Sequence, residues 1–215
     1  ARVRTHLKLK TYTDHLEREV ATRTRELEAI QNVTILTLAS LAETRDNETG
    51  KHIIRTKEYI KVLAEQAAAL PRYRDALDAA MIATIHKSAP LHDIGKVGIP
   101  DTILLKPGRF DPAEMEVMKT HTTVGREAIQ RAEQELGEDV AFLRVAKEIT
   151  YSHQEKWDGT GYPEGLSGDA IPLSARLMAV ADVYDALISR RVYKEGMPHD
   201  KAVDIIRQGR GSHFD

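Results

Sequence analysis

The sequence predicts an all-α protein. Ala, Leu, Glu, Lys and Arg, which favour helices, dominate the 215 residues, and aromatic residues make up only 5% of them. No stretch shows the sustained alternation of Val, Ile and Thr that is typical of strands. Apolar residues instead recur at intervals of three and four. We therefore expect a helical bundle preceded by one long N-terminal helix.

Residues 1 to about 40 predict that first helix. Its narrow apolar stripe contains Leu9, Leu16, Val20 and Leu27, with charged residues between them. Leu9 to Val20 and Leu16 to Leu27 are each eleven residues apart, which indicates a stutter in a coiled-coil repeat. A narrow stripe favours a parallel, self-pairing coiled coil. The alternative is an amphipathic helix docked on its own domain.

The following residues predict helices separated by polar segments and prolines. A polar junction or a helix distortion at 43–50 precedes a helix that carries His52 and ends before Pro71. The next helix should begin near Asp75, and the sequence Ser88-Ala89-Pro90 either breaks it or restarts it just before His92. A loop then covers 98–109.

The C-terminal half contains four further predicted helices. Asp111, Pro112 and Glu114 have the spacing of an N-cap with a capping box, and the same helix should carry His121. The next helix should deliver His153 at its C-terminal end. A third should begin at Ser174 and carry Asp182, and a fourth should begin near Asp200. We thus expect an N-terminal signalling and dimerisation helix (1–40) and a helical domain (41–215).

Composition limits the classes of function. The formal net charge of -2 gives no reason to expect a nucleic acid as partner. No run of 18 or more apolar residues is present, so we expect no membrane-spanning segment. The lack of cysteine excludes disulfides and cysteine nucleophiles, and it fits a cytoplasmic protein. The chain begins at Ala1 and stops after Asp215, and we expect it to be part of a longer protein.

The adjacent residues His92 and Asp93 are the first indication of a metal site. On a helix, neighbouring side chains are about 100° apart, so both can reach one cation while the second carboxylate oxygen reaches another. Other candidate ligands lie on, or just beyond, segments whose apolar neighbours would bury them: His52, His121, His153 and Asp182. One such histidine is usually a core residue, but the set indicates metal ligation. The remaining histidines, His6, His15, His86, His199 and His213, have no such context.

A turn-rich insert, Asp158-Gly159-Thr160-Gly161-Tyr162-Pro163, lies between His153 and Asp182. Together with the His-Asp pair, it resembles the HD-GYP family of metal-dependent phosphodiesterases that cleave cyclic di-GMP. The resemblance covers about 41–215 and includes Trp157-Asp158-Gly159 and Ile171-Pro172-Leu173. It implies a helical bundle of the HD superfamily. Residues 2–7 also resemble the end of a receiver domain, which implies a cytoplasmic response regulator with an upstream receiver domain and a histidine kinase as partners.

The family's metal ligands match positions in this chain. The resemblance implies that one divalent ion is held by His52, His92, Asp93 and Asp182. Asp93 would bridge to a second ion, whose other ligands are His121, His153 and the next residue, commonly a histidine but here Gln154. An amide oxygen is a weaker ligand than imidazole, so this second site should be poorer. Some members hold a third ion through the glutamate that corresponds to Glu48. Iron or manganese is the expected metal, with nickel or zinc as alternatives.

Further residues match functional positions of the family. Two cations about 3.5–4 Å apart can activate water and stabilise a phosphate without a protein nucleophile. Lys96, three residues after Asp93, should add a positive charge at the phosphate. Asp185 should either orient a ligand from behind or bind substrate, and Arg191 and Lys194 should contact the substrate. We expect Tyr162 to pack rather than to catalyse.

These residues leave three functions to compare. The first is hydrolysis of cyclic di-GMP, either to linear pGpG or onward to GMP, with a homodimer formed through the N-terminal helix. The second is another nucleotide phosphohydrolase of the HD superfamily, which the Gly161-Tyr162-Pro163 insert argues against. The third is a degenerate domain that binds metal or cyclic di-GMP and signals through protein partners, for which Gln154 is the evidence.

Overall fold

The computed structural model describes residues 2–45, 51–189 and 195–215. Helices make up most of these ranges, and no strand longer than an isolated bridge occurs within them. The predicted all-α fold is therefore confirmed. None of the described helices is both long and apolar enough to cross a membrane. Three candidate site residues, Glu48, Arg191 and Lys194, lie outside the described residues.

The chain divides into two units, 1–37 and 38–215. The described part of the first unit is helical and belongs to α1 (Arg2–Glu43), whose last residues are part of the second unit. Its apolar stripe is exposed in the single chain: Leu9 is 63%, Leu16 49% and Leu27 66% exposed. These side chains are therefore available for a partner, although the coiled coil itself stays a prediction.

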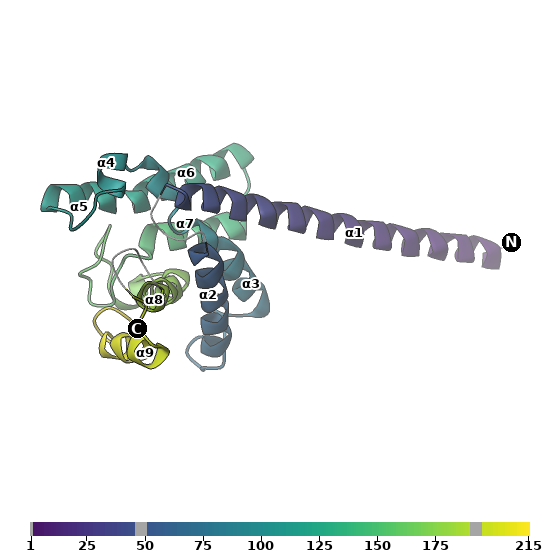
Figure 1. Cartoon of the computed structure of the whole chain (residues 1–215). Coiled ribbons are helices and arrows are strands. Elements are labelled where there is room, and N and C mark those ends of the chain that lie inside the picture. The colour runs from purple at the N-terminus through teal and green to yellow at the C-terminus, as the bar shows by residue number, and fades with distance from the viewer. Residues whose placement is uncertain (1, 46–50, 190–194) are drawn as a thin grey trace. The chain divides into compact units, whose positions relative to one another are not determined.

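The second unit is built around four helices (Figure 1): α2 (His52–Ala68), α3 (Ala79–Ser88), α7 (Ala141–Ser152) and α8 (Leu173–Ile188). Their apolar faces meet in one core that includes Ile60, Ile85, Val145, Ile149 and Met178, each no more than 1% exposed. Helix α6 (His121–Leu136) packs on α7, and α9 (His199–Gln208) packs on α8. Burial of these faces is the main stabilising contribution to the bundle.

The His-Asp pair does not lie on an α-helix, which corrects the sequence prediction. Residues 92 and 93 lie between two short 3-10 helices, η1 (Ala89–Leu91) and η2 (Ile94–Gly98). Gly95 explains how η2 approaches α6 so closely. A Cβ atom at Gly95 would lie 1.8 Å from the carbonyl oxygen of His121 and 2.5 Å from the nitrogen of Gly125. Only glycine permits this contact, which brings Asp93 to His121.

The segment from 98 to 136 corrects two further predictions. The expected loop contains the short helix α4 (Asp101–Leu104). The helix predicted to start at Asp111 begins with the expected capping box but ends early, as α5 (Pro112–Lys119). A break at Thr120 separates it from α6, where the Thr120 N–H donates to Val117 O (3.1 Å) in a 3-10 bond and the Thr120 hydroxyl donates to the same oxygen (2.6 Å).

The remaining boundaries differ by a few residues from the prediction. Helix α3 starts four residues later than Asp75, because Asp78 caps it by accepting a bond from the N–H of Met81 (2.7 Å). Helices α8 and α9 each begin one residue before the predicted position. Helix α7 ends at Ser152 with His153 as its C-cap, as predicted.

Candidate metal centre

Four buried histidines converge from different parts of the second unit. His52 and His121 are the first residues of α2 and α6, His92 lies between η1 and η2, and His153 follows α7. Each is no more than 4% exposed. Three of the rings place Nδ1 against a backbone carbonyl oxygen: His92 on Ala89 (3.0 Å), His121 on Met118 (2.8 Å) and His153 on Ile149 (3.0 Å). A carbonyl only accepts, so Nδ1 must donate and Nε2 is left to bind a metal.

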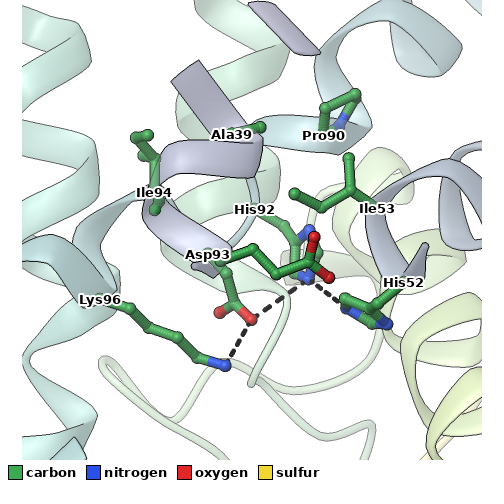
Figure 2. A pocket seen from close by; sticks show the side chains of 10 residues that line it. Ala39, His52, Ile53, Pro90, His92, Asp93, Ile94 and Lys96 are labelled. Atoms are coloured by element: carbon green, nitrogen blue, oxygen red, sulfur yellow. Dashed lines mark hydrogen bonds and ion pairs between the residues drawn. The ribbon is translucent and has the colours of Figure 1, made fainter. Parts of the chain in front are cut away.

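The first cluster consists of His52, His92 and Asp182, whose candidate ligand atoms all lie within 4.8 Å of one another. His52 Nε2 is 3.4 Å from His92 Nε2 and 3.6 Å from Asp182 Oδ1. Figure 2 shows the two histidines beside Asp93 at the wall of a small cavity. Two imidazoles and a carboxylate at this spacing suit a divalent transition metal.

The second cluster consists of Asp93, His121 and His153. Asp93 Oδ1 is 3.4 Å from His121 Nε2 and 3.5 Å from His153 Nε2. The other oxygen of Asp93, Oδ2, is 3.3 Å from His92 Nε2 in the first cluster. The two carboxylate oxygens therefore face different clusters, which is the arrangement of a bridging ligand.

Three buried polar atoms of the second cluster indicate whether these residues fit a metal ion. Asp93 Oδ1, His121 Nε2 and His153 Nε2 are shielded from solvent and have no hydrogen-bond partner in the part of the chain that the structure describes. Buried polar atoms without a partner cost free energy, so native proteins retain them where something else satisfies them. A cation coordinated by all three atoms would do so. The residues present therefore fit a metal.

The comparisons with known proteins agree with this geometry. Residues 37–215 match the family model described as HD domain. The chain belongs to the HD domain family. This match, together with the similarity to curated cyclic di-GMP phosphodiesterases and to a solved structure, confirms the predicted resemblance to the HD-GYP family.

Two relatives are much longer than this HD domain chain. A probable cyclic di-GMP phosphodiesterase of Vibrio cholerae is 57% identical over all of this chain and 50% of its own length. The cyclic di-GMP phosphodiesterase response regulator RpfG of Xanthomonas campestris is 40% identical over 93% of this chain and 49% of its own. The chain thus spans about half the length of these curated relatives. Among solved structures, an HDG"Y"P protein from Bdellovibrio bacteriovorus, Bd1817, has a similar fold, with a TM-score of 0.52, 24% identity, and coverage of 77% of this chain and 50% of its own.

The charges of this HD domain site favour a cation. Burial lowers the pKa of His121 to about 4, so its ring is neutral at pH 7, as a metal ligand must be. Burial also lowers the pKa of His92, but the carboxylates of Asp93 and Asp182 outweigh it and raise that pKa to about 9. Burial raises the pKa of Asp93, but Lys96 and His92 hold it well below its usual value. Carboxylates that stabilise a proton on His92 would equally stabilise a metal ion there.

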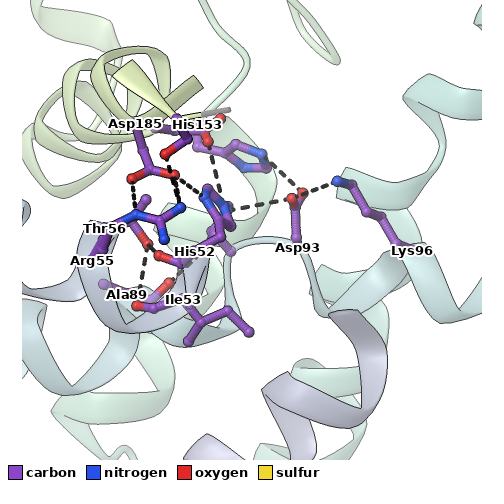
Figure 3. A network of polar contacts seen from close by, with 12 residues as sticks. His52, Ile53, Arg55, Thr56, Ala89, Asp93, Lys96, His153 and Asp185 are labelled. Carbon is purple, nitrogen blue, oxygen red and sulfur yellow. Dashed lines mark hydrogen bonds and ion pairs between the residues drawn. The ribbon is translucent and has the colours of Figure 1, made fainter. Parts of the chain in front are cut away.

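Asp185 lies behind His52 and orients it (Figure 3). Its Oδ2 is 2.8 Å from His52 Nδ1, and Arg55 donates to both of its oxygens, at 2.6 and 2.9 Å. Burial raises the pKa of Asp185, but His52 and Arg55 outweigh it and lower it to about 2. The side chain is 1% exposed, so its contacts fit the orienting role and leave no surface for substrate.

Sequence reasoning missed Arg55. The arginine pairs with Asp185 across 130 residues and also donates to Ser189 Oγ (2.9 Å). The only local signal was a basic residue one helical turn after His52, which is also common on solvent-exposed faces.

The turn-rich insert lies against the second cluster. The ring of Tyr162 packs edge-on against His121 with 6.3 Å between centroids, and burial raises the pKa of the phenol to about 12. The phenol therefore stays protonated at neutral pH, which fits a packing role. Glu155, which sequence reasoning also missed, anchors the insert by accepting bonds from the N–H groups of Glu164 (2.8 Å) and Leu166 (3.0 Å).

Gln154 stays a predicted ligand. It is half-buried beside His153, and its backbone carbonyl accepts a bond from the N–H of Tyr162 (3.2 Å). This bond ties the insert to the residue after His153.

Proposed function

We propose that this HD domain is a metal-dependent phosphodiesterase that hydrolyses cyclic di-GMP to linear pGpG, and onward to GMP. One observation carries the proposal: Asp93 places one oxygen in each of two neighbouring His and Asp clusters. Two adjacent divalent cations are a recurrent arrangement in enzymes that cleave phosphodiesters. The choice of cyclic di-GMP as substrate is supported by relatives that are named as cyclic di-GMP phosphodiesterases.

The chain's residues have separate roles in this reaction. When bound, a pair of divalent ions lowers the pKa of water and withdraws electrons from the phosphate. His52, His92 and Asp182 would hold one ion, His121 and His153 would hold the other, and Asp93 would contribute to both. Lys96 Nζ lies 2.8 Å from Asp93 Oδ2, at the edge of the cluster, where its charge can stabilise a phosphate oxygen. Arg191 and Lys194 are proposed to hold the rest of the substrate.

The metals proposed are iron or manganese, with nickel or zinc as alternatives, because imidazole and carboxylate ligands suit all four. Two ions account for the clusters described, and a third would require Glu48. Elemental analysis of the purified chain gives both the metal and its amount per chain. A content near two would support the two-cluster assignment, and a content near three would support Glu48.

A turnover assay tests the function. The full chain would be stripped with a chelator, reloaded with Mn²⁺ or, without oxygen, with Fe²⁺, and incubated with cyclic di-GMP. We expect pGpG and then GMP by chromatography, with cyclic GMP-AMP as the competing substrate to test selectivity. Metal-loaded protein that binds cyclic di-GMP without cleaving it would instead support the degenerate domain. Hydrolysis confined to linear nucleotides would support another phosphohydrolase of the superfamily.

We also propose that the protein is a cytoplasmic homodimer controlled by an upstream receiver domain and its histidine kinase. The exposed stripe on α1 supports the dimer, and the relative named as a response regulator supports the receiver. Light scattering over a range of concentrations should give twice the chain mass. Leu16→Glu, which places a charge in the stripe, should give a monomer, whereas Glu17→Gln on the same helix should not. A wild-type chain that stays monomeric at high concentration would contradict the dimer.

A further inference from the structure

The last turn of α1 has a buried face that carries a carboxylate. Ala39 is 2%, Ala42 5% and Glu43 8% exposed, whereas most of the preceding helix is exposed. Both carboxylate oxygens of Glu43 are shielded from solvent. A buried carboxylate requires a compensating charge or a set of donors, because its loss of hydration is costly. This position is therefore unusual for a glutamate on an otherwise small and apolar face.

Glu43 lines the same cavity as the metal ligands. The cavity has a volume of about 20 Å³, and its polar wall consists of Glu43, His52, His92, Asp93 and Lys96, of which the last four are labelled in Figure 2. A space of this size holds about one or two water molecules, so an ion or water within it is close to every polar group of the wall. Glu43 is thus placed beside the first cluster by a helix that the ligand motif does not include.

The surrounding charges indicate what Glu43 faces. The hydrogen bonds of Asp185 are the main cause that raises the pKa of Arg55 behind the first cluster, and the negative charge of Glu43 adds to it. Two other carboxylates, Asp93 and Asp182, already surround His92. Glu43 and Asp93 line the cavity together with Lys96, and Asp182 Oδ1 lies 3.6 Å from His52 Nε2 on the cavity wall. The negative charges of all three carboxylates would favour a divalent cation in the first cluster.

We propose that Glu43 belongs to the metal centre and supplies a third carboxylate to the ion held by His52, His92 and Asp182. This inference rests on the proposed function, because it assumes that the first cluster holds a metal. It adds a residue outside the predicted ligand set, and it makes the end of α1 part of the site.

Neighbouring contacts fix this end of α1 to the segment that carries the His-Asp pair. Arg45, two residues after Glu43, donates to the carbonyl oxygens of Val97 and Ile99 and pairs with Asp101 (2.7 Å). Val97 directly follows Lys96, and all three residues lie four to eight positions after Asp93 in the chain. A rotation of the last turn of α1 would therefore move Glu43 within the cavity and pull on η2 together.

Glu43→Gln tests the proposal in the full chain, because it removes the charge and keeps the shape. The probe is Mn²⁺ added to chelator-treated protein, with affinity measured by calorimetry and the thermal midpoint measured with and without the ion. Glu28→Gln, on an exposed position of α1, is the matched control. We expect the Mn²⁺ affinity of the variant to fall by about 10- to 100-fold, as for other residues that support a metal site.

The rise in the thermal midpoint caused by Mn²⁺ separates a metal-site role from a structural one. This rise should shrink in Glu43→Gln, because the variant lacks one negative charge that would attract the ion. A lower metal-free midpoint with an unchanged Mn²⁺ affinity would overturn the proposal. If Glu43→Gln does not fold, Glu43→Asp keeps the charge and should show an intermediate affinity. Wild-type protein that binds no Mn²⁺ would instead contradict the proposed function.

Discussion

The two halves of the metal centre are supported in different ways. In the first cluster, His52 is oriented by the carboxylate of Asp185, which is itself held by Arg55. In the second cluster, both His121 and His153 are oriented by backbone carbonyls in the helical turn before them. Side-chain support can be removed by substitution, whereas backbone support depends on where the helices break and end. The first half should therefore be the more sensitive to distant mutations.

The two halves also differ in how many strong ligands they offer. With the shared Asp93, the first cluster has two imidazoles and two carboxylates, and Glu43 would add another. The second has two imidazoles and the same shared carboxylate, with Gln154 in place of a third imidazole. Because imidazole binds these metals better than an amide oxygen does, we expect the second ion to bind more weakly.

The largest effect should follow from Asp93→Ala, because it removes the one ligand that both halves share. We expect the activity to fall by about 10³-fold or more, which corresponds to about 4 kcal/mol in the activation barrier. Elemental analysis should show loss of both ions. Asp204→Ala, at an exposed position on α9, is the control and should keep both metals and the activity. An Asp93→Ala protein with full metal content would refute the bridging role.

Asp185→Ala should affect the first half alone. Loss of the orienting carboxylate should lower the affinity of the first cluster for its ion by about 10- to 100-fold, as for other residues that hold metal-bound histidines. The second ion should keep its affinity, because backbone carbonyls orient His121 and His153. A two-step Mn²⁺ titration separates the two values. Equal losses at both steps would show that the halves do not have independent supports.

Gln154→His should strengthen the second half alone. An added imidazole should raise the affinity of the second cluster for its ion by about tenfold, or about 1.4 kcal/mol. It should also raise the activity at limiting metal. The same titration measures it, and Gln130→His on the more distant part of α6 is the control. If neither affinity nor rate changes, the side chain of Gln154 points away from the cluster.

Tyr162→Phe should have the smallest effect. Its ring packs against His121, and its protonated phenol has no role in the proposed reaction. We expect activity within about threefold of the wild type, a difference of less than about 1 kcal/mol. Tyr162→Ala, which removes the ring, should lower the activity more by loosening His121. A loss in Tyr162→Phe as large as that in Tyr162→Ala would assign the hydroxyl a role in catalysis.

Local patterns in the sequence determined the helical class and several boundaries. The capping box at Asp111 and the position of His153 at the end of α7 were both predicted correctly. Such features depend on residues within one or two helical turns, so the sequence expresses them directly. The six predicted ligands of the two clusters, which the structure brings together, came from the resemblance and its motif spacing.

Only the tertiary structure decided how those ligands are held. The 3-10 turns around His92 and Asp93 depend on Gly95 meeting the backbone of α6, and the orientation of His52 depends on a contact across 133 residues. Glu43 would have been assigned to a solvent-exposed polar junction from its sequence neighbours alone, yet it is buried beside the first cluster. Sequence periodicity describes one helix at a time, and it contains no record of which side chains from other helices complete a site.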